Sequence, residues 1–181
     1  VTIGAYHRPD FTLVLKAMIG LGAAVFPEDY PAPLLDTLAR APLWAQLLDF
    51  GHGTGHGVGY FMNVHEGPQM ISHRAYRFPD TEMKAGMITS DEPGLYRPGQ
   101  WGIRIENLIC AVPAGQSEFG NYLKFETLTL CPIDTRCIER QLLSEKELSW
   151  LNAYHEEVYR RLAPRVSGPA LAWLQARTAA I

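Results

Sequence analysis

The sequence predicts an α+β fold in which helices pack on an antiparallel sheet. Apolar residues recur at three- and four-residue intervals near both ends of the chain, as in helices with one buried face. Between Tyr60 and Pro132, short β-rich runs are separated by Gly and Pro turn signals, which favours antiparallel strands. The runs expected to form strands are 87–90, 102–112 and 123–130. The 181 residues contain no repeat and amount to one domain's worth of chain.

The first part of the chain is expected to be helical. The apolar spacing predicts a helix over 9–26 that Pro27 ends. A second helix is expected over 34–44, where Pro42 ends or bends it.

The last part of the chain is also expected to be helical. Residues 145–162 form an amphipathic pattern, and a last helix is expected over 169–178. Ser144 followed three residues later by Glu147 resembles a capping box, so the longer helix should begin there.

Composition excludes several classes of protein. The apolar fraction of 47% suits a globular core and argues against a disordered chain. A net charge of −3 without a Lys/Arg cluster argues against a nucleic-acid partner. The longest apolar stretch, 17–26, has about half the length of a membrane span, so no membrane partner is expected.

Cysteine usage indicates an intracellular protein. Cys110, Cys131 and Cys137 show no CxxC spacing, and an odd number does not suit a disulfide scaffold. Reduced thiols and the lack of a secretion signal at the start of the sequence predict a cytoplasmic location.

The segment 51–59 is the most unusual, because glycine occupies every second position. It does not match the dinucleotide-binding fingerprint. If the segment is extended, His52, Thr54 and His56 share one face, and the other face is bare backbone that another group must approach closely. Two imidazoles on one face suit a metal or a polar ligand. The alternative is a flexible loop with two solvated histidines.

Three further side chains could take part in chemistry. His65 lies in a loop soon after this segment and could move protons near neutral pH. Glu92 and Glu106 would come close if their strands pair antiparallel, and two close carboxylates suit a divalent ion. The alternative is a surface ion pair between Arg104 and Glu106. Asp91 would alternate to the opposite face from Glu92.

Four motifs, in this order and at this spacing, resemble the catalytic domain of Xaa-Pro aminopeptidases (aminopeptidase P), which belong to the pita-bread metallopeptidases. The motifs are HGTGHGVG (52–59), NVHEGP (63–68), DEPG (91–94) and GIRIEN (102–107). The segments 11–16, 125–133 and 150–155 resemble the cytosolic branch of that family, so the resemblance extends over nearly the whole chain.

The resemblance implies roles for six residues. His56 matches a histidine metal ligand, Glu92 a metal-binding carboxylate that acts as general base, and Glu106 the carboxylate that bridges two ions. His52 and His65 match histidines on the substrate side that assist catalysis, and Arg104 matches an arginine that braces the metal-site carboxylates.

The resemblance also implies the reaction and the fold. The reaction is hydrolysis of the bond between an N-terminal residue and a following proline, by a hydroxide that bridges two divalent ions, most commonly Mn²⁺, with Co²⁺ or Zn²⁺ as alternatives. The expected partners are peptides with proline at the second position and a second copy of the chain in a homodimer. The expected fold is the second half of a pita-bread domain, with helices on the outer face of a curved sheet.

One departure from the family pattern concerns the ligands. The family site has five ligands, two of which are aspartates upstream of the glycine-rich segment, and the aspartates of this sequence match neither. Residues 1–4 resemble a strand end, and the chain opens on Val1 instead of Met, so a fragment or processed chain that is inactive alone is expected. Residues 1–132 would be part of the catalytic core and 133–181 a helical extension.

Two other hypotheses stay open. One is a non-catalytic relative that binds peptides or dimerises, and the other is a prolidase-like or creatinase-like hydrolase of the same fold.

Overall fold

The computed structural model describes residues 7–77 and 80–181, which form two compact units. One unit consists of residues 13–129, and the other combines residues 7–12 with residues 130–181. The boundary therefore falls within the first helix, α1 (His7–Gly22). The strand end expected at residues 1–4 lies outside the described residues.

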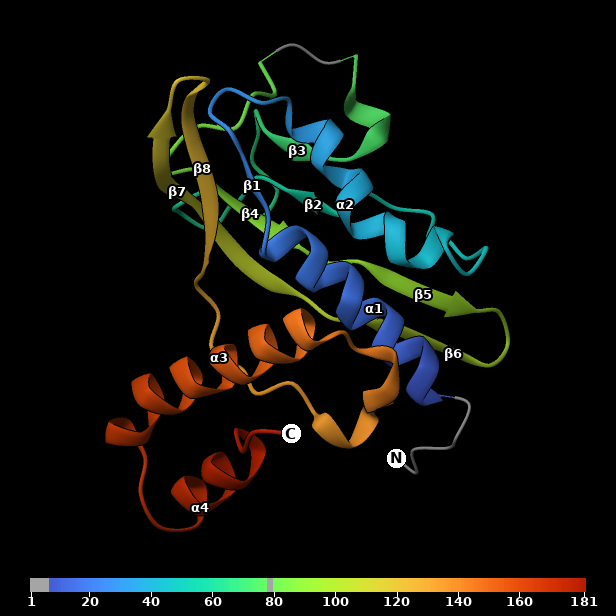
Figure 1. The fold of residues 1–181 in the computed structure, drawn as a ribbon, viewed down its shortest axis with the longest axis vertical. Helices are drawn as coiled ribbons and strands as arrows, with labels where there is room; N and C mark the ends of the chain where they lie inside the picture. Colours follow the sequence, from blue (N-terminus) through green and yellow to red (C-terminus); the bar gives the residue numbers. More distant parts are fainter. Residues whose placement is uncertain (1–6, 78–79) are drawn as a thin grey trace. The chain divides into compact units, whose positions relative to one another are not determined.

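The larger unit contains a four-stranded antiparallel sheet with the strand order β1-β8-β7-β4 (Figure 1). These strands are β1 (Val25–Pro27), β4 (Ile88–Asp91), β7 (Asn107–Ser117) and β8 (Gly120–Thr127). Two smaller antiparallel pairs adjoin it, namely β2 (Gly55–His56) with β3 (Met70–Ile71), and β5 (Gly94–Arg97) with β6 (Trp101–Arg104). A short 3₁₀ turn, η1 (His73–Ala75), follows β3.

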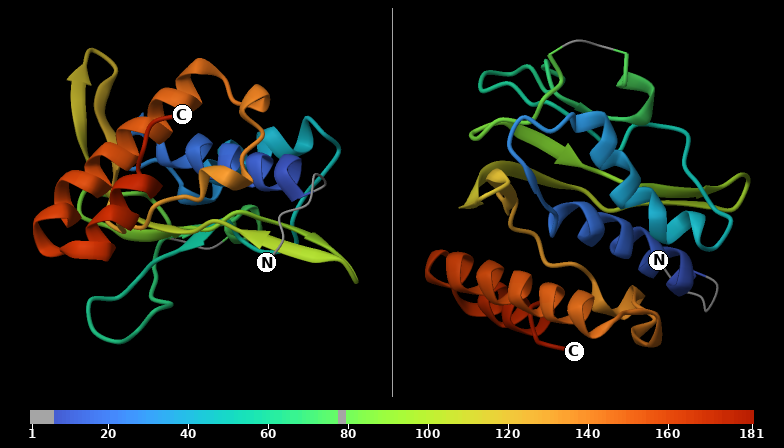
Figure 2. Two further views of the ribbon diagram at one scale, coloured as in Figure 1. Left: turned by 90° about the horizontal axis from the view of Figure 1, so that it is seen from below. Right: turned by 45° about the horizontal axis from the view of Figure 1, so that its top comes forward.

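Helices α1 and α2 (Ala32–Trp44) lie on one side of the strands, and the loop between β2 and β3 extends on the other side (Figure 2, left). The core lies between these helices and the sheet, because both contribute fully buried apolar side chains. From the helices these include Val14, Leu21, Leu35 and Leu43, and from the strands Ile109, Ala111 and Leu123.

Two predicted boundaries are wrong. Helix α1 ends at Gly22, and Val25 and Phe26 instead pair with β8, because Phe26 buries its ring against Phe125. By contrast, α2 ends at Trp44 as predicted, with Pro42 inside the helix. The strand expected over 102–112 is two strands, β6 and β7, with a break at residues 105–106.

This break places the two glutamates opposite each other. Asp91 of β4 pairs with Asn107 of β7, and Gly94 of β5 pairs with Arg104 of β6. The residues between these two ladders follow the same register. Glu92 therefore lies opposite Glu106, although neither residue belongs to a ladder. The antiparallel arrangement expected for these strands is therefore confirmed.

The outer edge of β4 is covered by the glycine-rich segment. The amide of Val58 donates to the carbonyl of Ile88, and the amide of Glu92 donates to the carbonyl of Thr54. An isolated antiparallel bridge joins Gly57 to Thr89 between these two bonds. The segment 54–58 thus lies along β4 almost as a further strand.

The smaller unit is helical. The helix α3 (Glu145–Leu162) begins at the predicted capping box, in which Ser144 and Glu147 each bond the other's backbone amide. It is followed by η4 (Ala163–Arg165) and α4 (Gly168–Arg177), and is preceded by the short turns η2 (Thr135–Cys137) and η3 (Arg140–Leu142).

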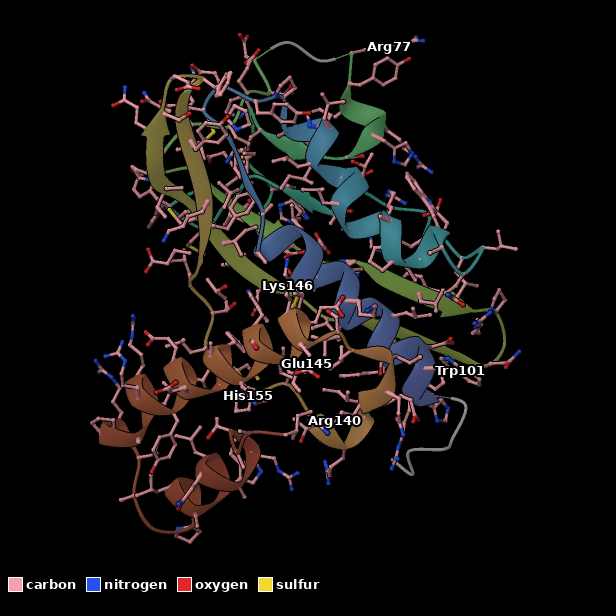
Figure 3. The ribbon with its side chains drawn as sticks, viewed as in Figure 1. Arg77, Trp101, Arg140, Glu145, Lys146 and His155 are labelled. Carbon is pink, nitrogen blue, oxygen red and sulfur yellow. The ribbon has the colours of Figure 1, made fainter. Side chains whose placement is uncertain are left out.

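Two side chains of α3 hold the segment that precedes these turns. Tyr154 bonds both the amide and the carbonyl of Cys131, and the amide of Ile133 donates to Nε2 of His155. His155, labelled on α3 in Figure 3, is fully buried.

Across residues 7–77 and 80–181, none of the helices has both the length and the apolar character needed to cross a membrane.

Candidate functional site

A cavity of about 280 Å³ in the larger unit brings several predicted site residues together. Its lining comes from the glycine-rich segment, from the end of β4, from β3 and the residue after it, and from the end of β6. The lining residues are His52, Gly53, Gly55, His56, Met70, Ser72, Glu92 and Arg104.

Two glycines of the segment, Gly55 and Gly57, are explained by close approach of other backbone, as predicted. A Cβ atom at Gly55 would overlap the carbonyl oxygen of Ser90, and one at Gly57 would overlap the carbonyl oxygen of Glu66. Gly51, by contrast, has open space around it. The segment is extended only in part, because regular strand covers only β2, and Thr54 turns away from the cavity into the buried interior.

His56 and Glu92 meet in this cavity. Nε2 of His56 lies 3.2 Å from Oε1 of Glu92, and both side chains are mostly buried. Nδ1 of His56 lies 3.0 Å from the carbonyl oxygen of Gly57, which can only accept a hydrogen bond. Both ring nitrogens of His56 therefore face acceptor oxygens, and with the proton kept on Nδ1 the lone pair of Nε2 would be available to an ion held between the imidazole and Glu92.

Ser90 joins the two residues a second time. Its hydroxyl donates to Oε1 of Glu92 at 3.0 Å and accepts from the amide of His56 at 3.0 Å. Ser90, a residue of β4, therefore holds both the backbone of His56 and the carboxylate of Glu92. Sequence reasoning missed Ser90, although its position two residues before Glu92 on a strand puts both on one face.

Arg104 lies on the opposite side of Glu92. Its Nη1 atom is 3.1 Å from Oε2 of Glu92, and its Nε atom donates to the hydroxyl of Tyr96 at 2.9 Å. The Tyr96 hydroxyl and Nη2 of Arg104 both approach Nε2 of His52, at 2.8 and 3.2 Å. Nδ1 of His52 faces the carbonyl oxygen of Gly53 at 2.8 Å, so Nε2 is the accepting atom.

Sequence reasoning also missed Tyr96. The signal was present in the two glycines of its hairpin, because a Cβ at Gly94 or Gly102 would collide with the Tyr96 ring. Two glycines facing one aromatic side chain indicate that its ring lies flat across the strand pair.

Glu106 is exposed and does not line the cavity. Its charge still acts on the site. Burial by itself would lower the pKa of Arg104, but the hydrogen bond to Tyr96 and the negative charges of Glu92 and Glu106 raise it. The ion pair formed by Arg104 is with Glu92, so the alternative of a simple surface pair with Glu106 does not describe this arginine.

His65 and Asp91 complete the set of predicted positions. The ring of His65 is exposed, and its centroid lies 4.4 Å from that of His56. Asp91 is fully buried away from the cavity, which confirms that it faces the opposite side from Glu92. Burial, and then the charge of Glu92, raise the pKa of Asp91 well above its usual range.

The donor set of the cavity fits divalent ions in part. A free imidazole nitrogen beside a carboxylate oxygen is a combination that borderline divalent ions accept. Within the described ranges, however, no group of three or more His, Cys, Asp or Glu side chains is placed to hold an ion. The residues present therefore fit part of a metal site, with His56 and Glu92 as its observed donors.

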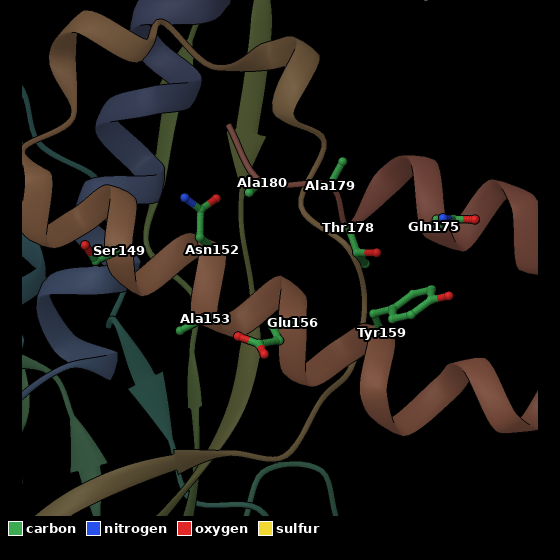
Figure 4. Close-up of a pocket in the computed structure, with 9 residues that line it drawn as sticks. All are labelled: Ser149, Asn152, Ala153, Glu156, Tyr159, Gln175, Thr178, Ala179 and Ala180. Carbon is green, nitrogen blue, oxygen red and sulfur yellow. The ribbon is translucent and has the colours of Figure 1, made fainter.

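A larger cavity, of about 750 Å³, lies in the smaller unit between α3, α4 and the last residues. Figure 4 shows its lining, which consists mainly of small and uncharged side chains, with Glu156 as the charged one. A single carboxylate without a histidine does not suit metal or acid-base chemistry, so this cavity is not the candidate site.

Comparison with family models gives two matches. The model described as "Metallopeptidase family M24" matches residues 2–112, and the model described as "C-terminal region of peptidase_M24" matches residues 121–181.

Curated relatives agree with these matches. A "Probable Xaa-Pro aminopeptidase P" from Coprinopsis cinerea is 47% identical over 96% of this chain and 29% of its own length. "Aminopeptidase P2" from Arabidopsis thaliana is 48% identical over 91% of this chain and 23% of its own length. The chain thus spans less than a third of either relative.

A solved structure matches the whole chain. An X-prolyl aminopeptidase from Caenorhabditis elegans, described as a cytosolic enzyme with a di-nuclear active site, superposes with a TM-score of 0.92. It is 40% identical, and the match covers 100% of this chain and 30% of that protein. The predicted fold, antiparallel strands with helices as in X-prolyl aminopeptidases, is thereby confirmed.

Proposed function

Because this chain belongs to metallopeptidase family M24, we propose that it forms part of a Xaa-Pro aminopeptidase, which removes an N-terminal residue that precedes proline. The observation that supports this most directly is the pair His56 and Glu92. Nδ1 of the imidazole bonds Gly57, and Nε2 lies 3.2 Å from the carboxylate inside a cavity. The relatives named as Xaa-Pro aminopeptidases support the substrate class.

His56, Glu92 and Glu106 would hold divalent ions, and we propose two ions, most commonly Mn²⁺. When bound, such ions act as Lewis acids toward water and the scissile carbonyl. The di-nuclear site described for the Caenorhabditis elegans relative supports the number two. The remaining ligands would be two aspartates that this sequence does not supply, so the chain alone is expected to be inactive.

Each side chain then has a role that its geometry allows. The Glu92 carboxylate, which lines the cavity, accepts the proton of the attacking water, and the hydrogen bond from Ser90 orients it. Arg104 holds the Glu92 carboxylate in place through its 3.1 Å ion pair.

The two histidines act toward the substrate. Nε2 of His52 holds a polar group of the peptide after exchanging its bond with Tyr96, and His65 approaches from the loop beside His56. In this arrangement Nε2 of His52 accepts a hydrogen bond from the peptide, and the His65 imidazole is the one that can donate to the oxygen on which negative charge develops.

We also propose the setting of this activity. Residues 1–132 would belong to the catalytic core and 133–181 to a helical extension. The enzyme would work in the cytosol as a homodimer, and the cytosolic Caenorhabditis elegans relative supports the compartment.

The test compares the 181-residue chain with a version extended upstream through two aspartates. Mn²⁺ content and release of the residue before proline are measured for both, with an otherwise identical peptide that lacks proline as the control. We expect about two ions and cleavage for the extended version only, and loss of both in its Glu92→Gln variant. If the extended version neither binds ions nor cleaves, the non-catalytic, peptide-binding hypothesis replaces this one.

A further inference from the structure

The middle of α2 contains a buried ion pair that the proposed mechanism does not use. Nε of Arg40 lies 2.7 Å from Oδ2 of Asp36, and both side chains are completely shielded from solvent. Compared with apolar residues of similar size, a buried ion pair adds little net stability. Stability alone therefore does not account for its presence, and its other contacts need an explanation.

Arg40 reaches the start of the glycine-rich segment. Its Nη2 atom donates to the carbonyl oxygen of His52 at 2.6 Å, and Nη1 donates to that of Phe50 at 2.8 Å and to Oδ1 of Asp49 at 2.6 Å. The guanidinium also stacks on the Phe50 ring at 4.0 Å from its centroid. One side chain thereby holds two backbone carbonyls, those of Phe50 and His52, and the side chain of Asp49.

Asp36 bonds the same segment and also His73, the first residue of η1. Oδ1 accepts from the Thr54 hydroxyl at 2.5 Å, and Oδ2 accepts from the amide and Nδ1 of His73 at 3.0 and 2.8 Å. Burial alone would raise the pKa of Asp36, but the hydrogen bonds from Arg40, Thr54 and His73 outweigh it and lower the pKa. The carboxylate is therefore ionised at neutral pH.

The contact with Thr54 leads on to Glu92. The carbonyl oxygen of Thr54 accepts from the amide of Glu92 at 2.8 Å, so the backbone position held by Asp36 is also the one that holds Glu92. Glycine at every second position leaves this segment little stiffness of its own. Its geometry must be imposed from outside, and α2 supplies the charged groups that do so.

We propose that Asp36 and Arg40 are positioning residues, which set His52 on the substrate side and, through Thr54, Glu92 on the metal side. Neither touches the cavity, so both act through the glycine-rich segment. This inference rests on the proposed function for the roles of His52 and Glu92, while the positioning itself is a property of the folded chain.

The test uses four variants of the chain. Arg40→Lys keeps the charge but loses the planar fork that reaches two carboxylates and two backbone carbonyls. Thr54→Val removes only the hydroxyl that donates to Asp36, and Thr54→Ser restores it. Thr37→Ala is the matched control, because Thr37 is the neighbour of Asp36 on the exposed face of α2.

Two readouts do not depend on metal or activity. The first is the hydrogen-exchange rate of the Glu92 amide and of residues 50–56. The second is the tautomer of the His52 ring, read from its nitrogen chemical shifts, which should show Nδ1–H in the unmodified chain. Thermal unfolding is recorded for each variant to separate a general loss of stability from a local one.

We expect Arg40→Lys and Thr54→Val to accelerate exchange at these amides about tenfold or more while α3 is unchanged. Arg40→Lys should also mix the two tautomers of His52, and Thr54→Ser and Thr37→Ala should behave as the unmodified chain. In an active, extended version, Arg40→Lys should lower kcat/KM about 10- to 100-fold.

The proposal is overturned if both folded variants keep the His52 tautomer and the exchange rates of the unmodified chain. If Arg40→Lys fails to fold, the comparison of Thr54→Val with Thr54→Ser decides alone. A failed peptidase test leaves the exchange and tautomer results interpretable, so failure of this proposal and failure of the proposed function are distinguishable.

Discussion

The backbone orients the imidazole rings of both site histidines, His52 and His56. In both His52 and His56, Nδ1 lies against the carbonyl oxygen of the next residue, so Nε2 is directed into the cavity. In both cases the next residue is a glycine. One local pattern, His-Gly, thus prepares two side chains for ligand or substrate binding.

The same glycines lead to a prediction about single substitutions. Gly55→Ala should lower the free energy of unfolding by about 1–3 kcal/mol or more, because its Cβ would overlap the carbonyl oxygen of Ser90 on β4. Gly51→Ala is the matched control, since Gly51 has open space and the change should cost little. Urea unfolding of both variants measures the difference, and equal stabilities would contradict the close approach.

At the scale of elements, the capping box of Ser144 and Glu147 stabilises the start of α3. Ser144→Ala should cost about 1 kcal/mol, because it removes the side-chain acceptor for the Glu147 amide. The same substitution at Ser149, exposed inside the helix, should stabilise slightly, since alanine is the better helix former. Chemical unfolding of both variants should therefore show shifts of opposite sign, and shifts of one sign would disprove the cap's contribution.

The contact between α3 and the segment before η2 should depend on pH. Burial lowers the pKa of His155, whose Nδ1 finds no partner within the described chain and whose Nε2 accepts from Ile133. The unfolded chain takes up a proton near pH 6.5, whereas the folded chain does so only at lower pH. Stability is therefore full above about pH 6.5 and falls, by at most about 1.4 kcal/mol per pH unit, as pH drops toward the folded pKa.

Urea unfolding at pH 7.5, 6.5 and 5.5 measures this dependence. The chain and its His155→Gln variant should diverge in slope, with the variant less sensitive to acid over this range. Parallel slopes would show that His155 is not the group responsible.

At the scale of the whole molecule, every proposed ion-binding side chain belongs to the unit of residues 13–129. Mn²⁺ at about 100 times its dissociation constant should stabilise a version that binds it by about 2.7 kcal/mol. Hydrogen exchange should slow in residues 54–58 and 88–92 and stay unchanged in α3. Protection of α3 instead, reversed by a chelator, would place the ions elsewhere.

The sequence predicted the parts of the fold that depend on local pattern. The capping box of α3 and the helix in 34–44 follow from spacing and cap residues, which act within a few positions of the chain. The end of α1 did not follow, because Phe26 belongs to a strand only by virtue of Phe125, which lies a hundred positions away. Tertiary pairing of this kind overrides the helical spacing around it.

The site was predictable to a similar extent. His56, Glu92 and Arg104 follow from the motifs, and the structure brings them together. The Asp36–Arg40 pair was not predicted, because acidic and basic residues four apart on a helix are usually a solvated pair. Only the structure shows that this face of α2 is buried and that its side chains bond the glycine-rich segment.

The position of the glycine-rich segment along β4 has a consequence for the behaviour of the protein at high concentration. An open strand edge presents unpaired amides and carbonyls that recruit other chains into aggregates. The hydrogen bonds of Val58 with Ile88 and of Glu92 with Thr54 cover the edge of β4. The glycine-rich segment, which carries site residues, therefore also protects the sheet from pairing with other chains. Substitutions that loosen it would lower the yield of usable protein as well as its activity, and residues at this site are therefore constrained by solubility in addition to chemistry.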